Sequence, residues 1–154
     1  MFKLFSKGKP SKTAFRAAWL RAWAHKNFQN QIWGPDFLAE CFLPFPIRLL
    51  IKSEKSREIG RAKTNESSPG IYEYAIARTL FFDEVFSQAL KESIPQIIFL
   101  GAGYDSRGIR FEHLNNNTQI IELDMAATQN RKIKYLKKNK MKINVLNYFK
   151  LLMN

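Results

Sequence analysis

The sequence predicts an α/β fold: a Rossmann-like parallel sheet preceded by a helical cap. The main observation is a short apolar run, Ile97 to Leu100, that leads directly into Gly101-Ala102-Gly103. A buried parallel strand that ends in a glycine turn has this pattern. A second apolar run starts at Gln119 and ends in Asp124, 23 residues after Gly101. Glycines let a backbone approach a ligand closely, and an acidic residue about 20 residues further on suits a ribose hydroxyl.

Composition and charge narrow the class of protein. The chain has 154 residues, of which 45% are hydrophobic, enough for one globular domain with its own core. A single cysteine, Cys41, excludes an intramolecular disulfide and favours a reducing, cytoplasmic location. No apolar run reaches the ~18 residues of a membrane span. The net charge of +12 raises nucleic acid or an anionic membrane as partners, but we favour the interpretation as a solvated basic surface.

The first predicted element is a basic helix that Ser11 caps and that runs to about Lys26. Its apolar residues recur at helical spacing on one face, which can dock on the domain, lie on a membrane surface or belong to a transit peptide. We favour docking. The face consists of Phe15, Ala18, Trp19, Ala22 and Trp23.

Two shorter helices are predicted next, and then a loop. Asp36 can cap a helix towards Phe42, which Pro44 and Pro46 would stop, and residues 47–55 can form another helix. The polar stretch 61–70 is typical of a loop. It predicts a boundary between a helical N-terminal cap, residues 1–70, and a partial Rossmann-like cofactor-binding domain, residues 71–154.

A long helix is predicted over residues 71–91, and Arg78 lies on its apolar stripe. A buried arginine needs an anionic partner. The side chain can contact a ligand, snorkel to solvent, or pair with Asp83 or Glu84.

The predicted sheet continues after the glycines. A helix should begin between Asp105 and Arg110, where its first N–H groups would favour a ligand carboxylate. A lysine-rich helix is expected over residues 128–141, and a third strand over residues 143–149.

The pattern LGAGYDSR resembles motif I of class I S-adenosylmethionine-dependent methyltransferases, and GAGYDSRGIRF resembles the leucine carboxyl methyltransferase-like family. Three further elements are similar to that family in order and spacing. They are Glu122-Leu123-Asp124 at the end of the second strand, Arg78-Thr79 with Phe82-Asp83 upstream, and the opening Ser11-x-Thr13-Ala14 with Arg21-Ala22. The resemblance covers roughly residues 11–135.

This resemblance implies the first half of a methyltransferase fold, with S-adenosyl-L-methionine as cofactor and a small-molecule carboxyl or hydroxyl group as methyl acceptor. It implies that Gly101 and Gly103 pass under the methionine part of the cofactor. Asp124 would hold the ribose hydroxyls, Arg78 would pair with the cofactor carboxylate, and Asp105 would lie near the turn, where it can instead cap the helix. We identify no catalytic base and no metal site, and we expect no nucleic acid as substrate.

The sequence also departs from the family. Asn147-Tyr148-Phe149 stands about where an acidic residue is expected, and Met125-Ala126 replaces the usual proline. The chain stops after the third predicted strand, which suggests a truncated member whose activity is doubtful. Half a parallel sheet has an open edge through which copies could self-associate. A non-catalytic basic protein that binds nucleic acid or anionic membrane is the alternative function, and a nicotinamide-binding domain is disfavoured by the missing third glycine.

Overall fold

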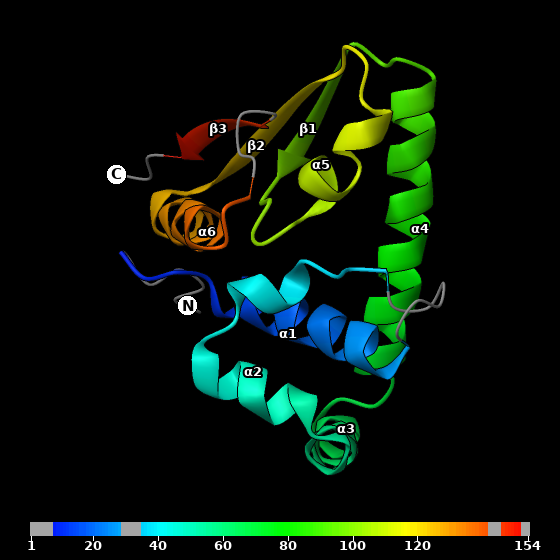
Figure 1. The fold of residues 1–154 in the computed structure, drawn as a ribbon, viewed down its shortest axis with the longest axis vertical. Helices are drawn as coiled ribbons and strands as arrows, with labels where there is room; N and C mark the ends of the chain where they lie inside the picture. The colour runs from blue at the N-terminus through cyan, green and yellow to red at the C-terminus, as the bar shows by residue number, and fades with distance from the viewer. Residues whose placement is uncertain (1–7, 29–34, 142–145, 152–154) are drawn as a thin grey trace, which may run out of the picture.

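A three-stranded parallel sheet and the helices around it make up the computed structural model, which describes residues 8–28, 35–141 and 146–151 (Figure 1). The strand order is β1-β2-β3, so the predicted α/β fold with a parallel sheet is confirmed. The predicted residues 143–145 of the third strand lie outside the described part.

The strands are β1 (Gln96–Leu100), β2 (Gln119–Met125) and β3 (Leu146–Leu151). The α-helices are α1 (Lys12–Asn27), α2 (Phe45–Lys52), α3 (Glu54–Ser67), α4 (Ile71–Lys91), α5 (Arg107–Arg110) and α6 (Ala126–Lys138). Two short 3-10 helices are η1 (Ala39–Phe42) and η2 (Glu112–Leu114).

The register of β1 and β2 brings the glycine turn to the end of β2. Leu100 is opposite Leu123, and the N–H groups of Gly101 and Ala102 both donate to the Leu123 carbonyl, at 2.8 and 3.1 Å. The ladder therefore continues into the turn for two residues beyond β1. Parallel strands end at the same edge of a sheet, so this register places the glycine turn beside Asp124, the acidic residue at the end of β2.

Helix α1 confirms the prediction that the N-terminal aromatic face docks on the domain. The Ser11 hydroxyl accepts a hydrogen bond from the Ala14 N–H at 3.1 Å and thereby caps the helix. Ala18, Ala22 and Trp23 are almost completely buried. Phe15 and Trp19 are partly buried and pack against the core, so this apolar face is directed to the rest of the chain.

One hydrophobic core joins the cap to the sheet. Phe42 and Ala18 from the N-terminal part lie in the same buried cluster as Ile120 of β2 and Leu136 of α6. In Figure 1, α1, α2 and α3 lie together below the sheet, and α4 runs alongside both. Whether residues 1–70 and 71–154 fold as separate units stays a prediction.

The predicted loop over residues 61–70 is wrong, because α3 extends through it to Ser67. Ser53 caps this helix by accepting from the Ser56 N–H, and Arg61 forms an ion pair with Glu73 of α4 at 2.6 Å. The polar composition of the segment correctly indicates that it is exposed, because α3 has no buried residue. Exposure and helix formation are compatible, and the turn itself is confined to residues 68–70.

The predicted cap by Asp36 is also wrong. The helix that follows is the short η1, and the Asp36 carboxylate binds Arg21 and Ser106 instead. Helix η1 ends at Phe42, before Pro44, as expected, but the next helix begins at Phe45 and not at residue 47, so it includes Pro46. Pro44 is the N-cap of α2 and Pro46 lies in its first turn, where a missing N–H costs nothing.

Apolar side chains remain exposed on α4 and on the outer edge of β1. Leu100 is 80% exposed, and Phe81 and Val85 of α4 are 60% and 49% exposed. β1 is an edge strand of the described sheet. In the part of the chain that the structure describes, no helix is long and apolar enough to cross a membrane.

Candidate functional site

The glycine turn after β1 has the backbone conformation that only glycine adopts easily. Gly101 and Gly103 have φ angles of +66° and +56°. A side chain on Gly101 would meet nothing within 4 Å, so the space above this residue is open. A Cβ atom on Gly103 would lie 3.1 Å from the Cβ of Ala14, because the start of α1 packs directly against the turn.

Asp124 at the end of β2 is bonded to this turn. Its Oδ2 accepts from the Gly103 N–H at 2.5 Å, and its Oδ1 accepts from the Met125 N–H at 2.6 Å. The side chain is buried, with 8% of the residue exposed. The two bonds fix the carboxylate beside the glycines, as the spacing in the sequence predicts.

Asp105 lies two residues after the glycines and is held by Arg107. Its Oδ1 accepts from the Arg107 N–H at 2.9 Å, and its Oδ2 forms an ion pair with the same guanidinium group. The cap weighed for Asp105 is nevertheless not formed, because the N-cap of α5 is Ser106, without a side-chain capping bond, and Asp105 lies one residue before it. The helix that it precedes, α5, has only one turn, so the predicted anion-binding helix start is not formed.

Arg78 is exposed, and its predicted place on a buried stripe is wrong. The buried residues of α4 are Tyr72, Thr79, Asp83, Phe86 and Leu90, so the helix is rotated by about one residue. The Arg78 guanidinium lies 5.7 Å from the centre of the Phe82 ring, and that of Arg107 lies 5.5 Å from the same ring. Arg78 is therefore a neighbour of the arginine that holds Asp105, although no contact joins it to the glycine turn.

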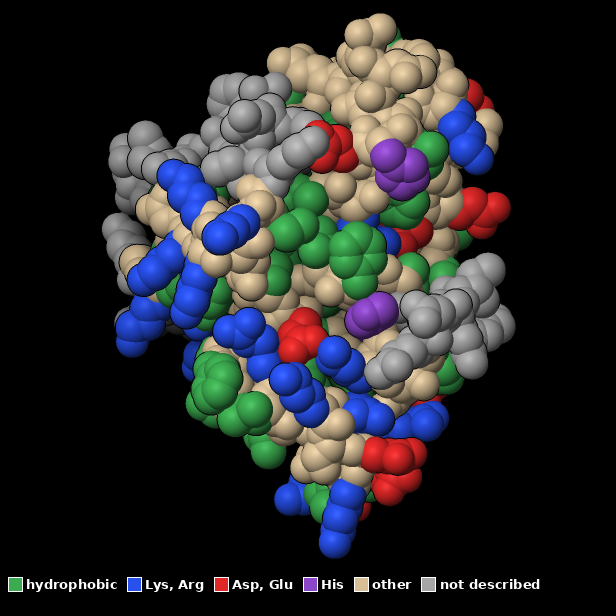
Figure 2. Space-filling model, viewed as in Figure 1, with side chains coloured by type: hydrophobic (Ala, Val, Ile, Leu, Met, Phe, Trp, Pro, Cys, Tyr) green, Lys and Arg blue, Asp and Glu red, His purple; other side chains and the backbone are tan. Residues whose placement is uncertain are grey.

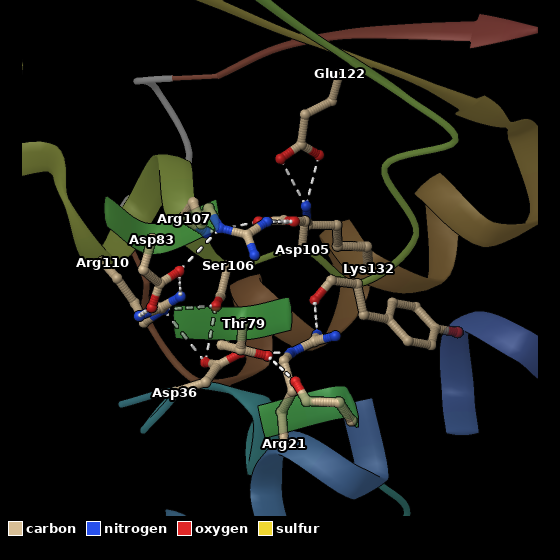
Figure 3. A network of polar contacts seen from close by, with 12 residues as sticks. Arg21, Asp36, Thr79, Asp83, Asp105, Ser106, Arg107, Arg110, Glu122 and Lys132 are labelled. Carbon is tan, nitrogen blue, oxygen red and sulfur yellow. Dashed lines mark hydrogen bonds and ion pairs between the residues drawn. The ribbon is translucent and has the colours of Figure 1, made fainter. Parts of the chain in front are cut away.

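A polar cluster that the sequence analysis did not predict connects the cap to the segment after the glycines (Figure 3). Arg21 of α1 donates from Nε to Asp36 Oδ2 and from Nη2 to the Tyr104 carbonyl, both at 2.7 Å. Ser106 donates from its hydroxyl to Asp36 Oδ1, also at 2.7 Å. Burial alone raises the pKa of Asp36, but Arg21, Arg110 and Ser106 together hold it below its ordinary value.

Asp83 of α4 holds the other side of the same cluster. Its Oδ1 accepts from Arg107 Nε at 2.8 Å and from Arg110 Nη2 at 2.7 Å, and its Oδ2 accepts from Arg110 Nη1 at 2.8 Å. Burial opposes the charge on Arg110, but Asp83 and Asp36 raise its pKa above the ordinary value. Arg107 and Arg110 thus hold α4 against the segment after the glycines.

A second buried pair lies beneath the sheet between β2 and α6. Lys132 donates from Nζ to both carboxylate oxygens of Glu122, at 2.7 and 2.5 Å, and the two side chains are 0% and 1% exposed. Gln129 donates to the Glu122 carbonyl at 2.8 Å. Burial raises the pKa of Glu122, and Lys132 acts against this shift. The pair ties α6 to the strand that ends in Asp124. Its only signal in the sequence is an acid on a buried strand ten residues before a lysine.

Comparison with known proteins agrees with this geometry. The sequence model of the leucine carboxyl methyltransferase family matches residues 14–149, and the chain belongs to this family. Two curated relatives carry the name "Putative S-adenosyl-L-methionine-dependent methyltransferase". The one from Streptomyces avermitilis is 34% identical over 65 residues, which are 42% of this chain and 23% of the relative. The one from Mycolicibacterium paratuberculosis is 40% identical over 55 residues, which are 36% of this chain and 17% of the relative.

The predicted methyltransferase family is thus confirmed, and family and relatives give S-adenosyl-L-methionine as its cofactor. The residues present fit such a ligand. The space above Gly101 is open, and the Asp124 carboxylate is fixed at the edge of that space by two backbone N–H groups. The matched segments span less than a quarter of each curated relative.

Proposed function

We propose that the chain binds S-adenosyl-L-methionine at the end of β1 and β2 and serves methyl transfer to a carboxyl or hydroxyl oxygen of a small molecule. The observation that carries this proposal is the 2.5 Å hydrogen bond between the Gly103 N–H and Asp124 Oδ2. It joins the two residues that a nucleoside ligand needs on adjacent strand ends: a close-approach glycine and a carboxylate for its ribose hydroxyls.

Each residue of the proposed site has a separate part. Gly101 and Gly103 allow the methionine portion to pass close to the backbone, and Asp124 accepts from the ribose hydroxyls. Arg78 supplies the cation for the cofactor carboxylate, which its exposure and its position beside Arg107 support. Asp105 acts by keeping Arg107 and the turn in place.

The bound cofactor supplies an electrophilic methyl group. A carboxylate acceptor is already a nucleophile at neutral pH, so the protein needs only to position it and exclude water. A hydroxyl acceptor would require a base. The polar groups closest to the turn, Asp105 and Asp124, are both engaged in hydrogen bonds, which favours a carboxylate acceptor. The exposed edge of β1 supports the prediction of self-association.

Binding is tested by calorimetry and thermal melts of the full chain with S-adenosylhomocysteine, with NAD as the control ligand. At ~100 times its dissociation constant, a ligand adds about 2.7 kcal/mol to the free energy of unfolding. We expect stabilisation by S-adenosylhomocysteine and none by NAD. A cooperative melt that S-adenosylhomocysteine leaves unchanged refutes the proposal.

Two variants separate the parts of the ligand. Arg78→Gln should weaken S-adenosylhomocysteine about tenfold or more but leave 5′-methylthioadenosine unchanged, because the latter lacks the carboxylate. Asp124→Asn should weaken both ligands, since both carry the ribose. Glu84→Gln, an exposed neighbour on α4, is the control. Equal loss of both ligands in Arg78→Gln would contradict the role given to this arginine.

A further inference from the structure

Helix α2 leaves an apolar face uncovered on the far side of the core. Ile51 is buried and Ile47 packs against the core, which fixes the inner face of the helix. Phe45 and Leu49 are four residues apart on the outer face and are 65% and 49% exposed, and Leu50 beside them is 52% exposed. Apolar residues therefore lie on both faces of this eight-residue helix, and its polar side chains are Arg48 and Lys52.

The charge around this face is mostly positive, although the exposed Glu54 begins the next helix. Between Cys41 and Ser53 the sequence contains Arg48 and Lys52 and no acidic residue. Arg57 of α3 donates to the carbonyls of Ile51 and Lys52, which adds a cation at the end of α2. Figure 2 shows Lys and Arg side chains gathered around the exposed apolar group in this region. Glu40, the preceding acid, is paired with Lys26 at 2.8 Å.

The exposed apolar face of α4 provides the contrast. Phe81 and Val85 are as exposed there as Phe45 and Leu49 are on α2. The exposed residues of α4 and its C-cap also include Glu73, Glu84 and Glu92. Exposed apolar area is therefore common to both helices, and of the two only α2 combines it with a net positive charge.

We propose that the outer face of α2 is a docking surface for an anionic lipid bilayer. A phenylalanine and two leucines gain free energy by entering the boundary between headgroups and acyl chains, and surrounding lysines and arginines are attracted to anionic headgroups. A nucleic acid would use the cations but not the leucines. A second copy of the chain would bring two cationic surfaces together, so like charges would oppose the contact.

The surface differs from the one that the sequence suggested. The aromatic face of the N-terminal helix, considered there as a membrane contact, packs against the rest of the chain. An amphipathic pattern alone therefore does not show which helix can reach a bilayer, because the fold decides which apolar face stays exposed. The proposal does not depend on cofactor binding.

The test is co-sedimentation of the full chain with sucrose-loaded vesicles. Phosphatidylcholine vesicles with about 30% phosphatidylserine are compared with pure phosphatidylcholine, and we expect at least about tenfold tighter binding to the anionic vesicles. Leu49→Asp should weaken this binding by more than about tenfold. Its matched control, Val85→Asp, makes the same change at an equally exposed residue of α4 and should alter binding by less than about threefold.

A second pair of variants tests the charge without altering an apolar residue. Lys52→Glu removes a cation from the last turn of α2, and Lys91→Glu makes the same change in the last turn of α4. We expect a loss of about fivefold or more in the first and little change in the second. Far-UV circular dichroism confirms that each variant is folded, and Lys52→Glu decides the outcome if Leu49→Asp is not.

Three results would overturn the proposal. The first is no binding to anionic vesicles. The second is binding that falls equally in the α2 and α4 variants, which would indicate general attraction of a basic protein. The third is capture by single-stranded DNA, unaffected by Leu49→Asp, without vesicle binding.

Discussion

Asp83→Asn is the sharpest test of the polar cluster behind the glycine turn. The substitution keeps the shape of the side chain but removes the charge that holds Arg107 and Arg110 together. The three side chains are only 9%, 11% and 4% exposed. Two guanidinium groups would then share a buried site without the carboxylate between them, so we expect a clear loss of stability.

The structure sets the size of this loss. Removing one partner of a buried ion pair costs about 3–5 kcal/mol. Arg107 keeps its contact with Asp105, and Arg110 keeps Asp36 and Ser106, so the lower end of the range applies. We therefore expect the free energy of unfolding to fall by about 3 kcal/mol. For a chain of this length this corresponds to a decrease in Tm of roughly 6–12 °C.

Urea unfolding followed by tryptophan fluorescence measures this difference. Glu84→Gln removes one negative charge from the next, exposed residue of α4 and should change stability by less than about 0.5 kcal/mol. If Asp83→Asn loses less than about 1 kcal/mol, or no more than the control, then Asp83 does not anchor the arginines and the reasoning fails.

Three further predictions concern pH, packing and thiol reactivity. The pKa of Asp36 is held below its ordinary value of 3.8, so its contribution to stability is present above about pH 4 and is lost as the pH falls through the lower folded-state pKa. Asp36→Asn should therefore destabilise the protein near neutral pH, and this loss should shrink as the pH falls below about 4; a loss in urea unfolding that does not change with pH would contradict this. Replacing a helical glycine by alanine usually raises Tm, but Gly60→Ala should lower Tm, because the new Cβ would lie 2.8 Å from the buried Trp23 ring. A rise in Tm with unchanged tryptophan emission would contradict this packing. Burial, with the nearby negative charge of Asp36, raises the pKa of Cys41 to about 12. A thiol reagent at about pH 8 should therefore react at least ~100-fold more slowly with the folded than with the unfolded chain. Equal rates would show that the thiol is accessible.

The parts of the fold that the sequence predicts are those that depend on local patterns. The apolar run before Gly101 and the run that ends in Asp124 define two strands whose parallel pairing places the acid beside the turn. Ser11 and the spacing of the aromatic residues likewise define α1 and its buried face. In each case the signal lies within one helix or one strand–turn unit, so no knowledge of distant contacts is needed.

The segment 61–67 shows where local composition misleads. Its residues are mostly polar, and the serines and glycine that follow at residues 67–70 indicate a turn. The segment 61–67 is nevertheless helical; Ser53 caps this helix, and Arg61 pairs with Glu73 of the next helix. Polarity predicts that a segment is exposed, and only a cap or a partner determines whether an exposed segment is helical.

Buried charges explain why the sequence did not predict the polar cluster or the exposed position of Arg78. A single lysine, arginine or aspartate is normally assigned to the surface, since burying it alone costs several kcal/mol. Asp83, Arg107 and Arg110 are buried because each neutralises another across more than twenty residues of sequence. The same pairing fixes the rotation of α4. Turning the helix by one residue would move Tyr74, Phe82 and Val85 towards the core, but it would withdraw Asp83 from both buried arginines. The uncovered apolar face of α4 and the exposed position of Arg78 therefore follow from one cause, the requirement that buried guanidinium groups keep their carboxylate.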